Sequence, residues 1–446
     1  MGCAMKRVAV IGSGIAGLSV AHALGRETRL TLFEAGRHFG GHTHTVDVTL
    51  DGVRHGVDTG FLVFNERTYP RLIQLFDELG VATAPSEMSF SVQSADGLEW
   101  SGNSLNSVFA QRRNLFSPRF LGMLADIVRF NRLATALALT LALADDAAEQ
   151  RETIGDFLQR HRFSAAFRDG YFLPMIGCIW SCPTDQMLRF PITTMVRFCH
   201  NHGLIQITDR PQWHTVRGGA RHYVQRLLDN IADARLATPV LAVRRQPPGQ
   251  GHAGVMVSTA LGSERFDEVV LACHSDQSLA LLRAGGDVTA DETRVLGAIR
   301  YHPNHAVLHT DTDVLPRRRL AWAAWNYARA AHHGREEAAV CLHYLINKLQ
   351  PLPWQQPVIV SLNPDPARLP DARHVIGEYS YSHPVFDQAA VAAQAQLPLI
   401  QGRSHVWFCG AWTRYGFHED GLMSGQAVVQ ALRTRWSADD VARLAA

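Results

Sequence analysis

The sequence predicts an α/β fold in which a Rossmann-like dinucleotide-binding domain, assembled from separated segments, receives an inserted α+β substrate-binding domain. Residues 6–42 have the pattern of a strand, a glycine turn, a helix and a second strand, in that order. Similar strand-then-helix patterns occur in the middle and at the end of the chain. The 446 residues are also too many for one ordinary core. We therefore expect the dinucleotide-binding domain at 1–75, 205–285 and 400–446. The substrate-binding domain takes 76–204 and 286–399, with its helical part at about 105–200.

The strongest signal is the stretch KRVAVIGSGIAGLSVAHALGRETRLTLFE at residues 6–34. Gly12 permits a tight turn after the first strand, Gly14 lets the backbone approach a pyrophosphate, and Gly17 lets the helix pack closely on the strand. The N–H groups at the start of that helix attract phosphates. Glu34 ends the second strand, where its carboxylate accepts hydrogen bonds from a ribose, whereas a 2′-phosphate would need an arginine there. A glycine turn without a ligand is the alternative, but it leaves the second strand and its acid unexplained.

The remaining segments are assigned from hydrophobic periodicity and glycine spacing. Short strands with glycine turns are expected at 46–64, and residues 105–165 are mostly helical. The further expected elements are a helix at Tyr69–Leu79, a helix at His222–Ile231, a hairpin of Val240–Arg245 and Val255–Thr259 around a loop, a buried strand at Glu268–Ala272 that runs into a helix, and a final strand, glycine-rich turn and helix at 404–436.

Composition excludes several classes of protein. A content of 46% hydrophobic and 19% charged residues is typical of a folded protein, and a net charge of +2 gives no basis for nucleic-acid binding. Seven scattered cysteines indicate a reducing, cytoplasmic setting. Cys178 and Cys182 lack a second Cys or His pair nearby, so we expect buried thiols and no metal. The sequence contains no run of 18 apolar residues, so it predicts no membrane-spanning helix.

Arginines alternate with apolar residues between positions 112 and 132. A basic amphipathic helix of this kind can lie on an anionic membrane surface. The segment taken alone favours the alternative, a helix packed on its own domain with its arginines in solvent.

Four of these segments resemble the flavin-containing amine oxidase superfamily. They are GSGIAG with Glu34, the doublet Gly40-Gly41, the stretch WHTVRGGARHYVQRL around Gly218-Gly219, and the closing GAW…GFHEDGLMSGQAVVQAL. The resemblance spans nearly the whole chain and implies an FAD-binding domain of the amine oxidase/glutathione reductase type. Where the family has Gly-Gly-Arg, this chain has His42, which leaves the phosphate contact to Arg37 or to the backbone.

The resemblance implies cofactor contacts at the glycine turn, around Glu34 and the glycine doublet, near the ring, at the adenine and in the closing motif. These residues are Gly12, Ser13, Gly14, Ile15, Ala16, Gly17, Glu34, Arg37, Gly40, Gly41, His42, Gly60, Phe61, Val240, Gly410, Ala411, Gly421, Leu422 and Met423. No cysteine lies between Gly410 and Ala431, so non-covalent FAD is expected.

Two departures from the amine-oxidising members bear on the substrate. Leu422 stands where those members have an aromatic ring that holds the substrate nitrogen, and His305 stands at or near the position of a lysine beside flavin N5. The amine-binding residues are thus missing. We expect a pocket for an apolar chain, lined by Trp412, Tyr415, Phe417 and Leu422.

The most similar subgroup comprises flavoproteins that accompany cyclopropane-fatty-acid-synthase-type methyltransferases, and GFHEDGLMSG and PNHAVLHTD…AWAAWNY carry this resemblance. It implies desaturation of a methyl-branched or cyclopropane-related fatty acyl chain in phospholipid, by hydride transfer to flavin N5. His305 and His418 are the candidate bases, with structural histidines as the alternative. Because the implied substrate is a lipid, peripheral contact of the protein with the inner face of the membrane and the absence of such contact both remain open. The implied partner is a methyltransferase.

Three other functions remain open. They are a flavin-dependent double-bond isomerase, an oxidase of a small amine or other soluble metabolite, and a flavin-bound scaffold for the methyltransferase.

Overall fold

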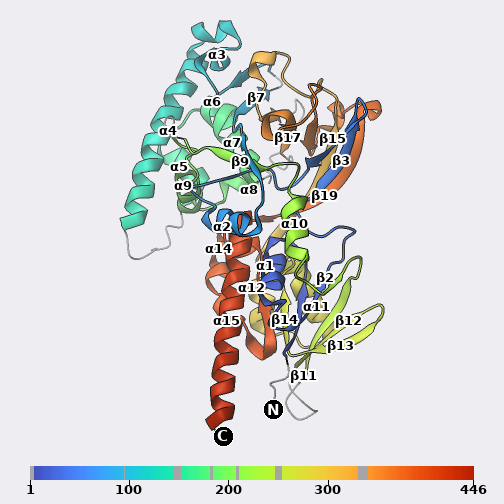
Figure 1. Ribbon diagram of the computed structural model, residues 1–446. Coiled ribbons are helices and arrows are strands. Elements are labelled where there is room, and N and C mark those ends of the chain that lie inside the picture. The colour runs from blue at the N-terminus through green and yellow to red at the C-terminus, as the bar shows by residue number, and fades with distance from the viewer. Residues whose placement is uncertain are drawn as a thin grey trace.

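The computed structural model describes residues 5–94, 96–143, 152–180, 184–206, 210–246, 254–329 and 340–445. Cys182 and the loop expected between the two hairpin strands lie outside these residues. The chain forms two large parts, one around a parallel sheet near the two termini and the other around a larger mixed sheet with helices (Figure 1).

A five-stranded parallel sheet, in the order β10-β2-β1-β14-β20, forms the first part. Its strands are β1 (Arg7–Ile11), β2 (Arg29–Phe33), β10 (Asp233–Arg235), β14 (Glu268–Leu271) and β20 (Val406–Phe408). They come from the start, the middle and the end of the chain. The predicted Rossmann-like α/β fold is therefore confirmed, while the domain boundaries themselves stay predictions.

Successive residues of β1 face opposite sides of this sheet, as a strand requires. Val8 and Val10 pack in a core with Leu18 of α1 (Ile15–Leu24). Ala9 and Ile11 pack with the antiparallel sheet β11 (Val240–Gln246), β12 (Gly254–Thr259) and β13 (Gly262–Phe266). Because both faces are covered, the strand consists of consecutive apolar residues. The expected hairpin is confirmed by the β11–β12 pairing.

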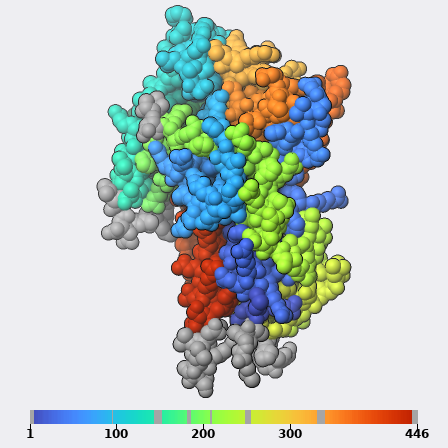
Figure 2. Space-filling view, viewed as in Figure 1, coloured from blue at the N-terminus to red at the C-terminus, as the bar shows by residue number. Residues whose placement is uncertain are grey.

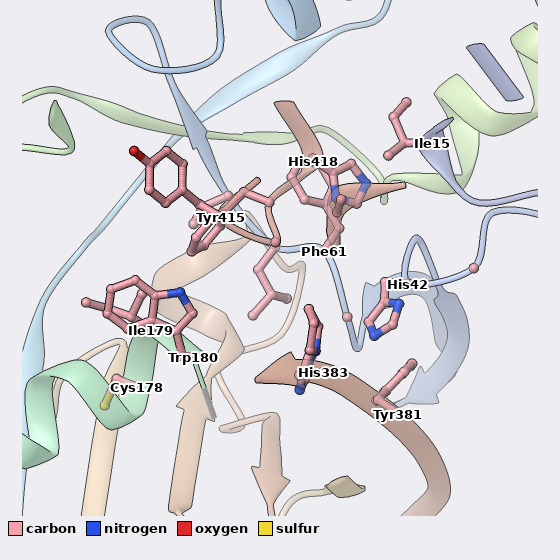
Figure 3. Close-up of a pocket in the computed structure, with 18 of the residues that line it drawn as sticks. Ile15, His42, Phe61, Cys178, Ile179, Trp180, Tyr381, His383, Tyr415 and His418 are labelled. Carbon is pink, nitrogen blue, oxygen red and sulfur yellow. The ribbon is translucent and has the colours of Figure 1, made fainter. Parts of the chain in front are cut away.

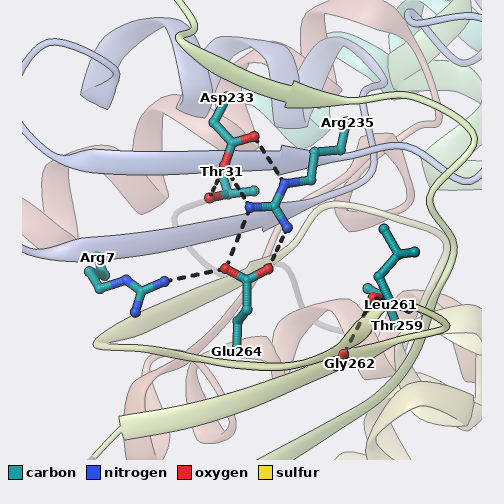
Figure 4. A network of polar contacts seen from close by, with 8 residues as sticks. All are labelled: Arg7, Thr31, Asp233, Arg235, Thr259, Leu261, Gly262 and Glu264. Atoms are coloured by element: carbon teal, nitrogen blue, oxygen red, sulfur yellow. Dashed lines mark hydrogen bonds and ion pairs between the residues drawn. The ribbon is translucent and has the colours of Figure 1, made fainter.

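A polar network ties β13 to the parallel sheet (Figure 4). Arg235 bonds both Glu264 and Asp233, its Nη2 lying 2.8 Å from the Asp233 carboxylate. Thr31 donates to Asp233 over 2.8 Å, and Arg7 lies 3.4 Å from Glu264. These groups are partly exposed, so they contribute little to the free energy of unfolding. Their main effect is to hold β13 in position against the parallel sheet.

The second part contains a seven-stranded sheet in the order β19-β15-β18-β17-β16-β7-β8. Helices α4 (Pro118–Leu143), α5 (Ile154–Arg160), α7 (Leu173–Trp180) and α9 (Ile192–Asn201) form its helical side (Figure 1). The strands are β7 (Phe90–Ser94), β8 (Glu99–Ser101), β15 (Arg300–His309), β16 (Trp325–Arg329), β17 (Cys341–Leu345), β18 (Ile359–Leu362) and β19 (Val375–Val385).

Several small elements connect the two parts. The hairpin of β3 (Thr45–Leu50) and β4 (Val53–Asp58) ends at the buried Asp58, whose carboxylate accepts from the backbone N–H of Ala220 over 3.0 Å and from Gln350 over 2.7 Å. Ala220 lies directly before α10 (Arg221–Leu228). Burial raises the pKa of Asp58 to about 7.

The expected helices are confirmed with small shifts at their ends. The helix expected at 69–79 is α2 (Pro70–Leu79), the one after β14 is α11 (Ser275–Gly285), and the final helix is α15 (His418–Ala445). Across the described ranges, no helix is both long and apolar enough to cross a membrane.

Candidate functional site

One cavity of about 1220 Å³ connects the glycine turn after β1 with the helical side of the larger sheet. Its lining comes from the start, the middle and the end of the chain. Figure 3 shows this convergence, with Ile15 and His42 on one side and Cys178, Ile179 and Trp180 on the other. We call the part next to the glycine turn the nucleotide end and the part near α4 and α7 the apolar arm.

The nucleotide end has the form of a phosphate cradle. A Cβ at Gly14 would meet no atom within 4 Å, so the backbone there is open, and α1 starts at Ile15 without a side-chain cap. A Cβ at Gly17 would lie 1.9 Å from the Gly12 carbonyl oxygen, which explains glycine at that position. The three glycine roles expected from the sequence fit this geometry. The uncapped N–H groups are suited to a pyrophosphate.

The glycine doublet folds back onto this turn. Gly40 donates from its backbone N–H to the Ser13 carbonyl over 3.1 Å, and Gly41 lies with Gly14 so close that its Cβ would be 3.2 Å from the Gly14 Cα. Both have positive φ, +117° and +60°. Gly60 is as tightly placed, since its Cβ would lie 2.1 Å from the His42 carbonyl oxygen. Side chains larger than hydrogen would close the cradle.

Glu34 lines the same end of the cavity. Its carboxylate accepts from the Ser13 backbone N–H over 3.0 Å and from the Gly36 N–H over 2.7 Å. These bonds hold both oxygens at the mouth of the turn, where a ribose hydroxyl could donate to them. Val240, expected at the adenine, also lines this end.

Three histidines, His42, His274 and His383, form a histidine wall along the cavity. The His42 ring lies 6.2 Å from that of His274 and 5.2 Å from those of His383 and Tyr381. Burial, with the neighbouring histidines, lowers the pKa of His42 to about 4. Within the described part of the chain, the buried His42 Nε2 has no hydrogen-bond partner. An unpartnered nitrogen beside a phosphate cradle fits an anionic ligand.

His418 lies where the two ends of the cavity meet, stacked on Phe61 at 3.7 Å between ring centroids (Figure 3). Its Nε2 is 2.9 Å from the Thr43 hydroxyl and 3.0 Å from the Tyr223 hydroxyl. Burial lowers the pKa of His418 to about 3, with a smaller contribution from His42. The ring is therefore neutral, one nitrogen is held by hydroxyls, and Nδ1 takes no part in those contacts.

The apolar arm is lined mainly by aromatic and aliphatic side chains. Trp412, Tyr415 and Phe417, which were expected in the pocket, line the cavity. Two polar atoms of the arm, Asn131 Oδ1 and Trp180 Nε1, are buried without a partner among the described residues. Other lining residues of the arm are Trp100, Val108, Leu124, Ile127, Tyr171, Met175, Ile179, Phe198 and Trp213.

Several expected site residues do not line the cavity. His305 projects from β15 away from it, half-exposed, with Nε2 2.9 Å from Glu378. Because side chains alternate along a strand, its neighbour Asn304 faces inward and bonds His383 over 2.9 Å. A role for His305 beside a bound ring is thus not supported. Arg37 is exposed and also lies outside the lining, so it does not replace the missing arginine in this structure.

Three residues at the start of α15 were also expected to contact the cofactor but do not reach the cavity. Gly421, Leu422 and Met423 are not among the lining residues, and Leu422 is buried in the main core. The helix packs tightly on α1, since a Cβ at Gly421 would lie 2.8 Å from Ile15 Cγ2 and one at Gly425 2.2 Å from the Ser19 hydroxyl. Gly410 and Ala411, earlier in the closing motif, do line the cavity, together with Ser13, Ile15 and Ala16.

The sequence reasoning missed the histidine wall beyond His42, and the aromatic lining of the arm. The signal for one part was present, because Tyr379, Tyr381 and His383 alternate along a single strand. For His274 and Trp100 there was no local signal, since only the packing of distant segments brings them to the cavity.

Comparisons with known proteins agree with this geometry. A model of the NAD(P)-binding Rossmann-like domain matches residues 10–79. Comparison with curated protein sequences finds no match. Among solved structures, the CLA-producing fatty acid isomerase from P. acnes is 15% identical, with a TM-score of 0.65 over 96% of this chain and 98% of that one.

Two oxidases are equally similar. Cyclohexylamine oxidase from Brevibacterium oxydans IH-35A is 16% identical, with a TM-score of 0.66 over 97% of this chain and 100% of that one. Wild-type putrescine oxidase bound to putrescine is 16% identical, with a TM-score of 0.66 over 96% of this chain and 99% of that one. The chain has the fold of these proteins. At this level of identity the likeness concerns the fold, so the activity follows from the site.

Proposed function

We propose that the protein is an FAD-dependent oxidoreductase that desaturates a methyl-branched or cyclopropane-related fatty acyl chain. The observation that carries the proposal is a continuous cavity, in which a phosphate cradle leads into a long apolar arm. A dinucleotide bound at the cradle would extend its reactive end toward His418 and the arm. A hydrocarbon chain fits the arm because its lining is mostly apolar.

The choice of FAD rests on the closing motif and on Glu34. Gly410, Ala411 and Phe417 of that motif line the same cavity as the glycine turn, so they could contact a dinucleotide bound there. Non-covalent binding is favoured by the state of the cavity thiols. Burial raises the pKa of Cys273 to about 11 and raises that of Cys178 as well, which disfavours the reactive thiolate form of both.

In the proposed reaction the acyl chain loses a hydride from one carbon and a proton from a neighbouring or vinylogous carbon, which leaves a new double bond. Bound FAD supplies the hydride acceptor at N5. The aromatic lining orients the chain and excludes water. His418 is the one histidine of the two candidates that reaches the cavity, and its neutral ring can hold or pass a proton through the Thr43 and Tyr223 hydroxyls.

A double-bond isomerase is the second candidate, because the structure of a fatty acid isomerase matches 96% of the chain. Both reactions would use the same apolar arm. They differ in electron balance, since isomerisation returns the hydride and desaturation does not.

Oxidation of a small amine fits the site less well. Two carboxylates line the cavity among the described residues: Glu34 lies at the nucleotide end, and Glu87 is paired with Lys348 at 2.9 Å. An ammonium group in the arm would therefore find no unpaired acid in the described lining there.

Anaerobic addition of methyl-branched acyl phospholipids to the FAD-loaded protein tests the proposal. We expect loss of the oxidised flavin absorbance and a lipid product two hydrogens lighter. A product of unchanged mass with a moved double bond would identify the isomerase. Flavin reduction by amines with none by lipids would overturn the proposal.

A further inference from the structure

The segment from α3 (Leu105–Val108) through the short helix η1 (Arg112–Phe116) to α4 exposes large apolar side chains. Phe116 is 86% exposed and Leu105 is 80% exposed. Of the fifteen large hydrophobic residues that are exposed in the described chain, six lie between residues 105 and 139. The other four are Leu115, Leu121, Val128 and Leu139. We call residues 105–139 the α3–α4 surface, and Figure 2 shows it in teal at the upper left.

This surface is also basic. It carries five arginines and one acid, Asp126. Asp126 is paired with Arg129 at 2.8 Å and also accepts from the Ser164 backbone N–H. Arg112 is exposed and bonds the Phe109 carbonyl over 2.8 Å, which keeps its guanidinium next to the exposed apolar residues. Apolar residues mixed with excess arginine complement an anionic lipid surface.

The inward-facing side of the same segment lines the cavity. Leu124, Ile127 and Asn131 of α4 and Val108 of α3 belong to the apolar arm. Leu121 and Val128 lie three and four residues from Leu124, so they occupy the flank of α4 next to the lining residues, and both are exposed together with Arg132. Helix α4 lies at the outer edge of the molecule (Figure 1), and its lining and exposed residues place it between the arm and the outer surface.

A lipid substrate makes this arrangement meaningful. Each methylene group of an acyl chain prefers hydrocarbon to water by about fourfold, so the transfer of a long acyl chain through water is strongly unfavourable. An enzyme whose arm lies directly under a membrane-bound helix avoids that transfer.

We propose that the α3–α4 surface docks on an anionic lipid bilayer and that the acyl chain enters the apolar arm from this side. The docking itself rests on the exposed residues, and the entry of the chain rests on the function proposed above. A protein partner on the same surface is the competing occupant.

The test is co-sedimentation of the FAD-loaded protein with vesicles, either of phosphatidylcholine alone or of equal parts phosphatidylcholine and phosphatidylglycerol. We expect binding to the anionic vesicles that weakens with salt. The pair Arg112→Gln and Arg113→Gln should bind about 30-fold more weakly, since each arginine near an anionic surface contributes about fivefold. The pair Leu105→Ser and Phe116→Ser should lose at least tenfold.

A matched control is available at the other end of the molecule. Leu261, in the β12–β13 turn, is 87% exposed, and Arg244 on β11 is exposed as well. The pair Leu261→Ser and Arg244→Gln removes the same kinds of group from a different surface and should bind as the unchanged protein does. Equal binding of all variants, or no binding to anionic vesicles, would overturn the docking.

The two proposals fail in distinguishable ways. Vesicle binding without any acyl turnover would leave the docking standing and overturn the proposed acyl desaturation. Turnover of detergent-dispersed lipid without vesicle binding would do the reverse. Self-association in sedimentation velocity that Phe116→Ser abolishes, with no vesicle binding, would assign the surface to a second copy of the chain.

Discussion

At the residue scale, His42 decides how the nucleotide end recognises charge. Its Nε2 has no partner in the described structure, and burial keeps the ring neutral. A pyrophosphate would supply both a hydrogen-bond acceptor and negative charge, which raise the pKa of a histidine. Binding of the cofactor would then be accompanied by proton uptake at His42.

We therefore expect FAD to bind more tightly as the pH falls through the pKa that His42 has beside the bound cofactor, which lies above its value of about 4 in the free protein; pH 8.5 and pH 6 are the two values to compare. The rings of His274 and His383 lie 6.2 Å and 5.2 Å from that of His42, and burial lowers the pKa values of both. His42→Ala should weaken the binding of FAD by roughly 10- to 100-fold. This corresponds to the loss of a hydrogen bond to a charged group, which contributes about 1.5–3 kcal/mol. His42→Arg should restore affinity and flatten the pH profile. Fluorescence titration of FAD at both pH values measures this, and a flat profile for the unchanged protein would contradict it.

His418 is the second residue whose role can be tested. His418→Phe keeps a ring to stack on Phe61 and removes the nitrogen that contacts Thr43 and Tyr223. If the imidazole handles the proton, substrate-dependent flavin reduction should slow by roughly 100-fold or more while FAD content stays the same. Stopped-flow anaerobic reduction measures the rate. An unchanged rate would assign His418 a structural role.

At the scale of elements, the contact of α1 with the first turn sets the cradle. Gly17 has no room for a Cβ, and α15 packs on α1 through Gly421 and Gly425. The closing motif and the glycine turn thus support each other through helix packing. This contact explains why Leu422 is a core residue instead of a pocket residue.

Gly17→Ala should displace α1 and abolish FAD binding, because its Cβ would overlap the Gly12 carbonyl oxygen. Gly122 in α4 is a matched control, since a Cβ there would meet nothing within 4 Å. Gly122→Ala should stabilise the protein by about 0.5–1 kcal/mol and leave FAD content unchanged. FAD absorbance after purification and thermal unfolding report both effects; normal FAD content in Gly17→Ala would refute the steric argument.

At the scale of the whole molecule, buried neutral histidines govern acid stability. Eight described histidines have a pKa lowered by burial to about 3 or 4, namely His42, His44, His202, His274, His309, His343, His383 and His418. In the unfolded chain they bind protons with a pKa near 6.5. Below that pH the unfolded state holds more protons, so acid favours unfolding.

We expect the free energy of unfolding to fall as the pH is lowered from 6.5 toward 4, by roughly 1 kcal/mol for each deeply buried histidine over the first pH unit and by less for the partly exposed His44. Asp58 and Asp420 act in the opposite sense, because burial raises the pKa of Asp58 to about 7 and that of Asp420 to about 6. The stability that these two protonated carboxyl groups contribute is lost as the pH rises through those values. The thermal midpoint should therefore be highest near neutral pH. Scans from pH 4.5 to 8.5 measure it, and a constant midpoint below pH 6.5 would contradict the histidine argument.

Sequence reasoning performed well where a function depends on neighbours in the chain. The glycine roles at positions 12, 14 and 17 and the placement of Glu34 follow from a local pattern; Gly12, Gly14 and Glu34 line one end of the cavity, and Gly17 packs against the Gly12 carbonyl. It performed poorly for His305, where a choice between adjacent residues on one strand decides which side chain faces inward. Strand pairing sets that choice, and β15 pairs with β19 about 75 residues away.

The sequence by itself determined the Rossmann-like α/β fold, the phosphate cradle and the basic, apolar character of residues 105–139, because each depends on residue types at short spacing. Only the tertiary structure decided that the cradle opens into an apolar arm, that a histidine wall lines it, and that α4 is both a wall of the arm and an exposed surface. These features join segments hundreds of residues apart, and no local pattern records which of them will meet. The physical reason is that burial and contact are properties of the packed chain, whereas turn and helix signals are properties of neighbouring residues.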